Sequence, residues 1–210
     1  MHRLEGLDRV AERCLATERW GSSVVCMLAD AGITSTGVGY FSVVVPRVRR
    51  FQREFVSSGR ICSLEELAEA ELGELMRVWG NRRSWRAVVE IAGVLRGYSG
   101  SDREALRRWA ASSVLSRWRS DPVGRIRGVG INTFQYLRMM GGVDTVMPDR
   151  IVRRFLQEVA GISAADEVEL VKLAEEHARG AGMSAAELCF TAWVWSCSDR
   201  EKAVEELLKI

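Results

Sequence analysis

The chain has 210 residues, a formal net charge of +2 and an apolar fraction of 47%. Such an apolar fraction excludes a disordered chain, and the length suits one globular domain or two small lobes that share a core. The small net charge gives no sign by itself of a nucleic-acid partner. Only three prolines are present, and leucine, alanine, glutamate and arginine recur at helical spacing, so we predict an all-α fold.

The cysteines and histidines indicate the redox state of the compartment and whether a metal site is expected. The five cysteines are odd in number and lie mostly in apolar segments, which predicts buried, reduced thiols and no disulfide framework. No CxxC pair occurs and only His2 and His177 offer nitrogen ligands, so we expect no zinc site. We expect no signal peptide, and no apolar run in the sequence is long enough to span a membrane. We therefore expect a cytoplasmic protein in a reducing compartment, with no membrane partner, and associated with the nucleoid if the source is prokaryotic.

In chain order, the first predicted helix covers residues 4–19, and Ser22 or Ser23 caps a second, buried helical segment over 24–31. Residues 32–39, rich in glycine, threonine and serine, predict a loop. The β-branched run over 41–45 fits either a strand or a buried helical turn, so residues 36–45 are left open between helix and strand. Further helices are expected over 46–55, from a Ser63 cap to residue 79, over 81–95, after an Asp102 cap, over 164–179 and over 184–196.

Arginine is far more frequent than lysine and clusters at residues 47–53, 82–86 and 150–154. The planar guanidinium fork suits phosphate better than the point charge of lysine. The alternative, that these are solvated helix faces partly paired with nearby glutamates, is the more common case for any one cluster.

The stretch from Ile126 to Phe155 carries the most specific pattern. It begins with Ile126-Arg127-Gly128-Val129-Gly130, where two glycines allow a tight reversal and leave the amides of the next helix pointing outward. Such amides bind phosphate without reading base sequence. An ordinary corner between two helices has the same pattern. Thr133 in the first turn and Pro148-Asp149 before a basic helix favour instead a phosphate-binding turn that is followed by a carboxylate at a helix start.

These motifs resemble those of the helix-hairpin-helix DNA glycosylases, the superfamily that includes endonuclease III and the adenine glycosylase for mispaired bases. The resemblance rests on Gly128-Val129-Gly130-Ile131-Asn132-Thr133-Phe134 and on Pro148-Asp149-Arg150-Ile151-Val152-Arg153-Arg154, and it extends over residues 63–156. It implies two helical lobes with an active-site cleft between them. One lobe would comprise residues 30–140 with the hairpin at about 120–140, and the other residues 1–29 plus 141–210.

The resemblance also implies roles for single residues. Asp149 matches the essential aspartate of the family, whose carboxylate stabilises positive charge on the sugar as a flipped base departs. The bland alternative is that Asp149 only caps the helix that follows it, although a cap can also fix a catalytic carboxylate. Asn132 stands where bifunctional members carry a lysine for the lyase step, and no lysine lies between residues 4 and 171. We therefore expect a monofunctional enzyme that uses water.

Further expectations concern ligands. Cys189 and Cys197 alone cannot hold the iron–sulfur cluster of some members, so we expect no cluster and no required cofactor. A monovalent cation at the hairpin is implied, on the carbonyls of Gly124, Ile126 and Val129. The side chain that fills the gap of the flipped base is expected in the 32–39 loop. The DNA contacts implied by motif position are Arg127, Gly128, Gly130, Ile131, Thr133 and Arg150, and possible pocket residues are Trp20, Gln135, Tyr136 and those of 34–36.

The predicted function is thus that of a DNA repair glycosylase that hydrolyses the N-glycosidic bond of a damaged or mispaired base. The expected partner is double-stranded DNA containing a lesion or mismatch, bound by a monomer. The alternative is a helix-hairpin-helix protein that binds DNA without catalysis; a carboxylate near phosphate argues against it, because it would repel the backbone. The sequence does not identify the base that is removed.

Overall fold

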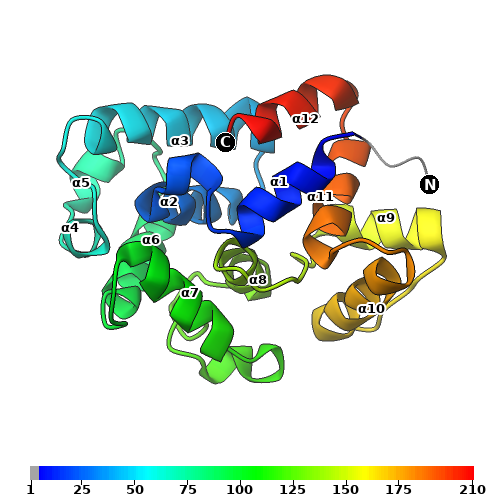
Figure 1. The fold of residues 1–210 in the computed structure, drawn as a ribbon. Helices are drawn as coiled ribbons and strands as arrows, with labels where there is room; N and C mark the ends of the chain where they lie inside the picture. The colour runs from blue at the N-terminus through cyan, green and yellow to red at the C-terminus, as the bar shows by residue number, and fades with distance from the viewer. Residues whose placement is uncertain (1–4) are drawn as a thin grey trace.

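The structure of the protein, a computed structural model, describes residues 5–210, and over this range it consists of helices and turns without a β-strand (Figure 1). The predicted all-α class is confirmed. The helices are α1 (Leu7–Leu15), α2 (Val24–Thr34), α3 (Val45–Phe51), α4 (Leu64–Ala68), α5 (Leu72–Leu75), α6 (Arg82–Leu95), α7 (Asp102–Ser112), α8 (Ile131–Met140), α9 (Arg150–Ala160), α10 (Glu167–Gly180), α11 (Ala185–Trp195) and α12 (Arg200–Leu208), with short 3-10 helices at Arg19–Ser22 and Leu115–Ser120 and π-helical turns at Tyr40–Val44 and Gln52–Val56.

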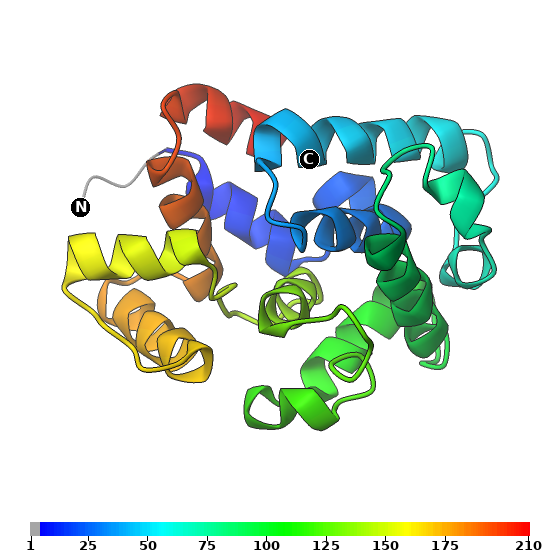
Figure 2. The same ribbon diagram turned by 180° about the vertical axis from the view of Figure 1, so that it is seen from behind.

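The helices pack in two groups that meet at α8. Helices α2, α4, α6 and α7 contact one another or α8, whereas α9, α10, α12 and α1 pack around α11. Figures 1 and 2 show α8 between these groups, with α6 on one side and α9 on the other. One continuous cluster of buried apolar side chains runs through both groups. The division into lobes at residues 29/30 and 140/141 stays a prediction.

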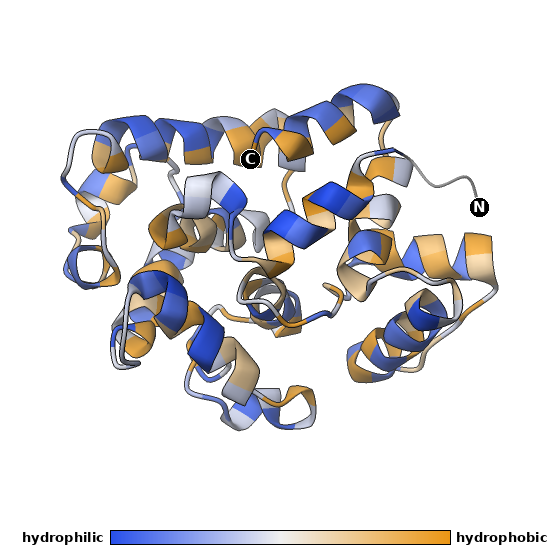
Figure 3. Cartoon of the chain, in the orientation of Figure 1, coloured by the Kyte–Doolittle hydropathy of each residue, from blue (hydrophilic) through white to orange (hydrophobic). Residues whose placement is uncertain are grey.

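Hydropathy follows this packing. In Figure 3 most helices, α3 and α12 among them, carry blue and orange stripes, as expected where one face is buried. Helix α11 is buried over almost its whole length, from Ala185 to Val194, which explains its nearly continuous apolar sequence. No helix in the described part of the chain is long and apolar enough to cross a membrane.

The start of the chain is shorter in helix than predicted. Residue 4 of the predicted helix lies outside the described residues, and α1 ends at Leu15. The segment that follows bends sharply, because Thr17, Trp20 and Ser22 all have positive φ values of 59°, 54° and 66°. Such φ values cost free energy in non-glycine residues, so other contacts must hold this segment in place.

Helix α2 extends beyond the predicted limit, and the expected loop over 32–39 is wrong for residues 32–34. Gly32 lies against α6 so closely that a Cβ there would be 2.2 Å from Cγ2 of Val88. Its carbonyl also accepts a hydrogen bond from Oγ of Ser84 at 2.7 Å. Close packing against α6 therefore outweighs the low helix propensity of the Gly-Ile-Thr sequence.

Two further expectations are corrected. Residues 40–44 form a π-helical turn that continues into α3, which settles the choice between helix and strand for this run. The predicted helix from Ser63 to residue 79 is instead two short helices, α4 and α5, separated by a turn. Ser63 does cap α4, in a capping box with Glu66.

Helix α7 is capped by Ser101 rather than by Asp102, because Ser101 forms a capping box with Glu104. Asp102 is the first helical residue, and its carboxylate accepts the backbone N–H of Leu64 at 2.8 Å, which ties α7 to α4. Of the cysteines, Cys62 is exposed, against expectation, because it lies in the turn before α4. Cys197 is half-buried and Cys14, Cys26 and Cys189 are buried; all five are free thiols.

Candidate active site

The site is built around the start of α8. Turns over residues 121–129 lead into the helix, with hydrogen bonds from the N–H of Arg125 to the carbonyl of Asp121 at 3.0 Å and from the N–H of Val129 to the carbonyl of Ile126 at 3.0 Å. The residues directly before the glycines thus form turns, and the nearest preceding helix is the 3-10 helix Leu115–Ser120.

Of the two glycines that the sequence singles out before α8, Gly128 has a backbone reason, whereas Gly130 has a φ of −101° and no atom within 4 Å of the place of a Cβ. Gly128 has a φ of +108°, a value that other residues rarely adopt. It packs on α6, where a Cβ at Gly128 would lie 3.6 Å from Nε of Arg83 and 3.6 Å from Cβ of Ala87. Gly124 approaches the backbone of Trp118, whose carbonyl oxygen would be 1.7 Å from a Cβ. The positive φ therefore explains Gly128, and close approach to the backbone of Trp118 explains Gly124.

The N-terminus of α8 is open. No side chain caps it, and Gly130 stands in the cap position. The first helical hydrogen bond runs from the N–H of Phe134 to the carbonyl of Gly130, so the amides of Ile131, Asn132 and Thr133 have no acceptor within the helix. Three such N–H groups, together with the positive end of the helix dipole, attract an anion.

Asp149 begins α9, as the sequence predicts. Its Oδ1 accepts the backbone N–H of Val152 at 2.8 Å, so the residue is the N-cap of the helix. Burial raises the pKa of the Asp149 carboxyl above its ordinary value, although the N–H groups of Val152 and Ile151 and the indole of Trp193 act to lower it. The ionised carboxylate is therefore short of solvation where it lies.

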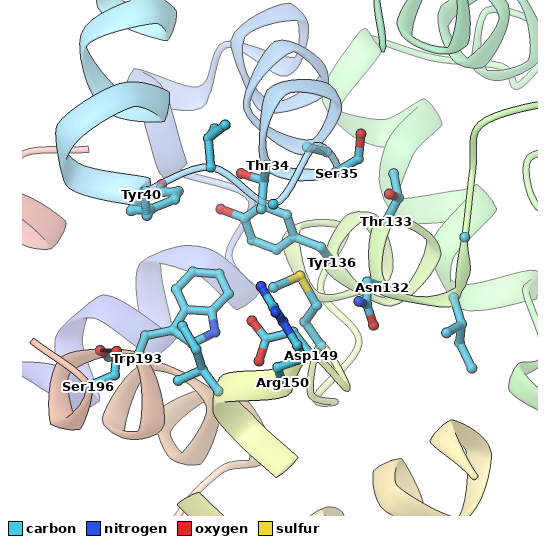
Figure 4. A pocket seen from close by; sticks show the side chains of 18 of the residues that line it. Thr34, Ser35, Tyr40, Asn132, Thr133, Tyr136, Asp149, Arg150, Trp193 and Ser196 are labelled. Atoms are coloured by element: carbon cyan, nitrogen blue, oxygen red, sulfur yellow. Dashed lines mark hydrogen bonds between the residues drawn. The ribbon is translucent and has the colours of Figure 1, made fainter. Parts of the chain in front are cut away.

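Helices α8 and α9 open onto a cavity of about 860 Å³. Asn132 and Thr133 line it from the start of α8, Asp149 and Arg150 from the start of α9, and Trp193 from α11 (Figure 4). The opposite wall comes from the end of α2 and the segment after it: Ala31, Thr34, Ser35, Gly37, Val38, Gly39, Tyr40, Phe41 and Ser42. Segments that are far apart in the sequence therefore line one cavity.

Two polar atoms at this cavity lack hydrogen bonds. Oδ1 of Asn132 and Nε1 of Trp193 are buried and have no hydrogen-bond partner among the described residues. Figure 4 shows the indole nitrogen of Trp193 turned toward the Asp149 carboxylate, close enough to lower its pKa without a well-formed hydrogen bond. Buried polar atoms without partners are costly, and a ligand that supplies the missing partners recovers that free energy.

A buried aspartate lies behind the aromatic wall of the cavity. Asp30 of α2 is fully buried, and its Oδ2 accepts Nε1–H of Trp20 at 2.8 Å and the hydroxyl hydrogens of Tyr40 at 2.9 Å and Tyr136 at 3.0 Å. Arg19, also buried, forms an ion pair with the same oxygen. These contacts hold the strained 17–22 segment and direct the tyrosine hydroxyls away from the cavity. We call Arg19, Trp20, Asp30, Tyr40 and Tyr136 the Asp30 cluster.

Charge at the helix starts differs across the molecule. Helices α4, α7 and α10 carry acidic residues in their first turns, which suits the helix dipole. Helices α6, α8 and α9 carry none, and Arg83 of α6 and Arg150 of α9 instead line the cavity. Both arginines are exposed and form no ion pair within the described structure. The first turns of α6 and α8 therefore have no acidic residue, whereas α9 has the Asp149 carboxylate at its N-cap.

Comparison with known proteins gives one match. A family model described as a domain of unknown function, DUF8548, matches residues 3–197. The chain belongs to the DUF8548 family. No curated protein and no solved structure matches the chain significantly. The matched range contains every residue that lines the cavity, so the cavity is a feature of the DUF8548 domain itself.

Within this DUF8548 domain, the structure brings most of the predicted site residues to one cavity. Besides the residues already placed, Gly128, Val129, Gly130 and Ile131 line it, and so do Thr34 and Tyr136 among the possible pocket residues. Arg127 is exposed outside the lining. Gln135 donates to Oγ1 of Thr145 at 2.6 Å and Trp20 belongs to the Asp30 cluster, so neither lines the cavity.

The carbonyls of Gly124, Ile126 and Val129, expected to bind a cation, lie in the segment before α8, and that of Ile126 already accepts the N–H of Val129. No group of three or more His, Cys, Asp or Glu side chains suited to a metal occurs among residues 5–210.

Sequence reasoning missed three residues of the DUF8548 cavity or its support: Trp193, Tyr40 and Asp30. Trp193 looked like a core residue because it is one of several tryptophans in apolar helices. Asp30 lies in an apolar run, and a lone acidic residue in such a run was a usable signal of a buried ion pair.

Proposed function

We propose that this protein is a monofunctional DNA glycosylase that removes a damaged or mispaired base from double-stranded DNA. The observation that carries the proposal is the position of Asp149: a desolvated carboxylate at the start of α9, facing a cavity of about 860 Å³ that also receives the open N-terminus of α8. A negative group for a developing cation and a positive site for phosphate thus share one cavity.

The proposed reaction follows from this arrangement. A nucleotide flipped out of the duplex enters the cavity, and its base lies against Tyr40, Tyr136 and Trp193. The C1′–N bond breaks with its electron pair leaving on the base, water adds to C1′, and one proton of that water ends on the released base. Positive charge builds on the sugar as the bond breaks, and the Asp149 carboxylate stabilises it.

The desolvation of Asp149 strengthens this effect. A carboxylate that water solvates poorly interacts more strongly with a nearby cation, because the local dielectric constant is lower. Its role as the N-cap fixes the carboxylate through the N–H of Val152 at 2.8 Å. Capping and catalysis are therefore compatible functions of one side chain.

Water is the proposed nucleophile because Asn132 stands where a lyase lysine would be. A carboxamide cannot form a Schiff base with the sugar, and the chain has no lysine between residues 5 and 171. We expect that borohydride traps no covalent adduct between protein and an abasic duplex. A trapped adduct would contradict the monofunctional assignment.

Phosphate binding is assigned to the amides of Ile131, Asn132 and Thr133, with Arg127 and Arg150 beside them. The segment after α2 supplies a candidate for the side chain that fills the space of the flipped base. Val38 is the one bulky apolar residue between Ser35 and Gly39, and it lines the cavity next to two exposed glycines. We assign that role to Val38.

The decisive experiment is a panel of duplexes containing uracil, mismatched thymine or adenine, alkylated bases and oxidised bases. We expect base release from one class, and we expect Asp149→Asn to reduce the rate by about 10²- to 10³-fold, the typical effect of removing one transition-state stabiliser. Asn also caps helices well, so DNA binding should persist. If no duplex loses a base, or if Asp149→Asn leaves the rate of base release unchanged, the proposal is wrong.

A non-catalytic DNA-binding protein is the second candidate. The observation that favours it is the hydrogen bond from the N–H of Val152 to Asp149, which gives the carboxylate a sufficient structural role as a cap. This candidate predicts binding to duplexes, no base release from any of them, and no change in binding on Asp149→Asn.

A further inference from the structure

A group of exposed arginines lies beside the cavity, on the side away from α9. Arg82, Arg83 and Arg86 lie in the first two turns of α6, and all three are exposed and free of ion pairs or hydrogen bonds within the described chain. The N-cap of α6 is the neutral Asn81, and its first turn has no acidic residue. Each arginine is therefore near the positive end of a helix dipole with no counter-charge.

A contact at Gly128 joins this group to a second one. Nε and Cγ of Arg83 lie 3.6 and 3.7 Å from the place where a Cβ of Gly128 would be. Arg125 and Arg127, in the turn just before Gly128, are exposed and likewise without partners. The arginines of α6 and of this turn thus form one basic surface that reaches the cavity at Arg83.

Several exposed arginines elsewhere in the described structure have acidic partners. Arg50 pairs with Glu54 at 2.6 Å, Arg60 with Glu74 at 2.5 Å, and Arg96, at the far end of α6, with Glu65 at 2.8 Å. Helix α6 therefore has a paired arginine at its C-terminal end and three unpaired ones at its N-terminal end. Along α6, the lack of partners is therefore confined to the end of the helix that lies at the cavity.

We propose that Arg82, Arg83, Arg86, Arg125 and Arg127, which we call the α6 arginine surface, bind the sugar–phosphate backbone of duplex DNA. This inference rests on the proposed function and extends it. Helices α6 and α9 lie on either side of α8 (Figures 1 and 2). The backbone is thus held on both sides of the flipped nucleotide, by the α6 arginine surface on one side and by Arg150 on the other.

The chemistry of the surface favours a polyanion over a small ligand. A small anion is usually held by buried groups that converge on it, whereas these five side chains are exposed and spread over two segments. Guanidinium forks make bidentate contacts with phosphate, and a row of them suits the repeated charge of a backbone. An acidic protein partner is the competing occupant, and the test distinguishes it.

The test compares two double variants with equal loss of charge. Arg82→Gln/Arg86→Gln removes two arginines of the surface, and Arg53→Gln/Arg96→Gln removes two elsewhere, one of them at the opposite end of the same helix. Affinity for a 25-base-pair duplex is measured by fluorescence anisotropy over a range of KCl concentrations. Poly-L-glutamate serves as a competitor of similar charge without phosphate.

We expect the first variant to bind about tenfold more weakly in 0.1 M KCl, and the slope of log K against log salt to fall by about 1.8, or 0.9 for each lost phosphate contact. Its thermal midpoint should stay unchanged or rise slightly, because two positive charges leave a helix N-terminus. The control variant should match wild type in both affinity and slope.

Three outcomes overturn the inference. Equal weakening in both variants would mean that net charge alone is responsible. Wild-type binding to duplex with no change in the first variant would remove the α6 arginine surface from the interface and leave the proposed function standing. Displacement of the duplex by poly-L-glutamate at equal charge concentration would assign the surface to an acidic protein. Failure of the wild type to bind any duplex would instead refute the proposed function itself.

Discussion

Two aspartates of this protein, the buried Asp30 and the half-buried Asp149, have opposite surroundings. Asp30 is wholly enclosed, and its Oδ2 receives hydrogen bonds from Arg19, Trp20 and two tyrosines, while its Oδ1 accepts the hydroxyl hydrogen of Thr34 at 3.0 Å. Asp149 has backbone N–H donors and an indole nearby, and it faces a cavity. Tyr40 and Tyr136, which donate to Asp30, pack against Trp193, whose indole acts on Asp149.

The difference separates a structural charge from a functional one. The charge of Asp30 is compensated within the protein, so it holds segments together and has nothing to offer a ligand. The charge of Asp149 is only partly compensated, which is unfavourable for the folded protein alone and favourable when a cation develops next to it. Stability should therefore depend on Asp30, and activity on Asp149.

The largest effect on stability is expected from Asp30→Ala. Loss of the carboxylate leaves Arg19, which is buried, without its partner, and breaking a buried pair in this way costs about 3–5 kcal/mol. Urea unfolding measures the change in the free energy of unfolding. Asp8→Ala, at an exposed position in the first turn of α1, is the control and should cost no more than about 1 kcal/mol. Similar losses in both variants would contradict the structural role of Asp30.

The free energy of unfolding of Asp149 variants should depend on which residue replaces the aspartate. Asp149→Ala removes the cap of α9 and is expected to lower the free energy of unfolding by about 0.5–2 kcal/mol. Asp149→Asn keeps a capping side chain and removes a poorly solvated charge, so stability at pH 7 should be unchanged or higher. The same urea experiment measures both variants. A larger loss for Asn than for Ala would show that the charge of Asp149 stabilises the fold.

A smaller effect is expected from Tyr136→Phe. The hydroxyl of Tyr136 donates to Asp30 at 3.0 Å, and loss of one such hydrogen bond typically costs about 1 kcal/mol. Tyr98→Phe is the matched control, because the Tyr98 hydroxyl makes no hydrogen bond within the described structure and the residue is half-buried. Thermal unfolding distinguishes the two. Equal midpoints would mean that Tyr136 contributes little to the Asp30 cluster.

The pH dependence gives the smallest and most diagnostic effect. Because burial raises the pKa of the Asp149 carboxyl in the folded protein, the folded state binds that proton more tightly than the unfolded state. Wild type should therefore gain stability relative to Asp149→Asn as the pH falls from 7 through the raised pKa, and the gain should level off below the ordinary value of about 3.9.

Base release should change in the opposite direction over the same pH range, because only the ionised carboxylate stabilises a cation. Single-turnover rates measured from pH 7 to pH 4 test this. A wild-type rate that stays constant down to pH 4 would contradict an essential ionised Asp149. Wild-type stability that increases relative to Asp149→Asn as the pH rises would contradict the raised pKa.

Much of the local structure follows from the sequence. The caps Ser23, Ser63, Asn81, Asp149 and Ser184 all lie at or within one residue of the predicted helix starts. A cap depends on hydrogen bonds between residues two or three positions apart, so the sequence alone specifies it. The same locality explains why the glycines before α8 and the aspartate before α9 were recognisable.

The tertiary structure decided what depends on contacts between distant residues. Gly32 is helical because α6 packs closely against it, and Asp30 is a satisfied charge because Arg19, Tyr40 and Tyr136 converge on it. Trp193 and Arg83 belong to the cavity because α11 and α6 bring them beside α8. The sequence by itself determined where helices begin and that the Asp149 carboxylate starts α9. The burial that raises the pKa of Asp149 and the cavity that Asp149 faces arose only from packing, because burial and cavity both depend on side chains more than forty residues away in the sequence.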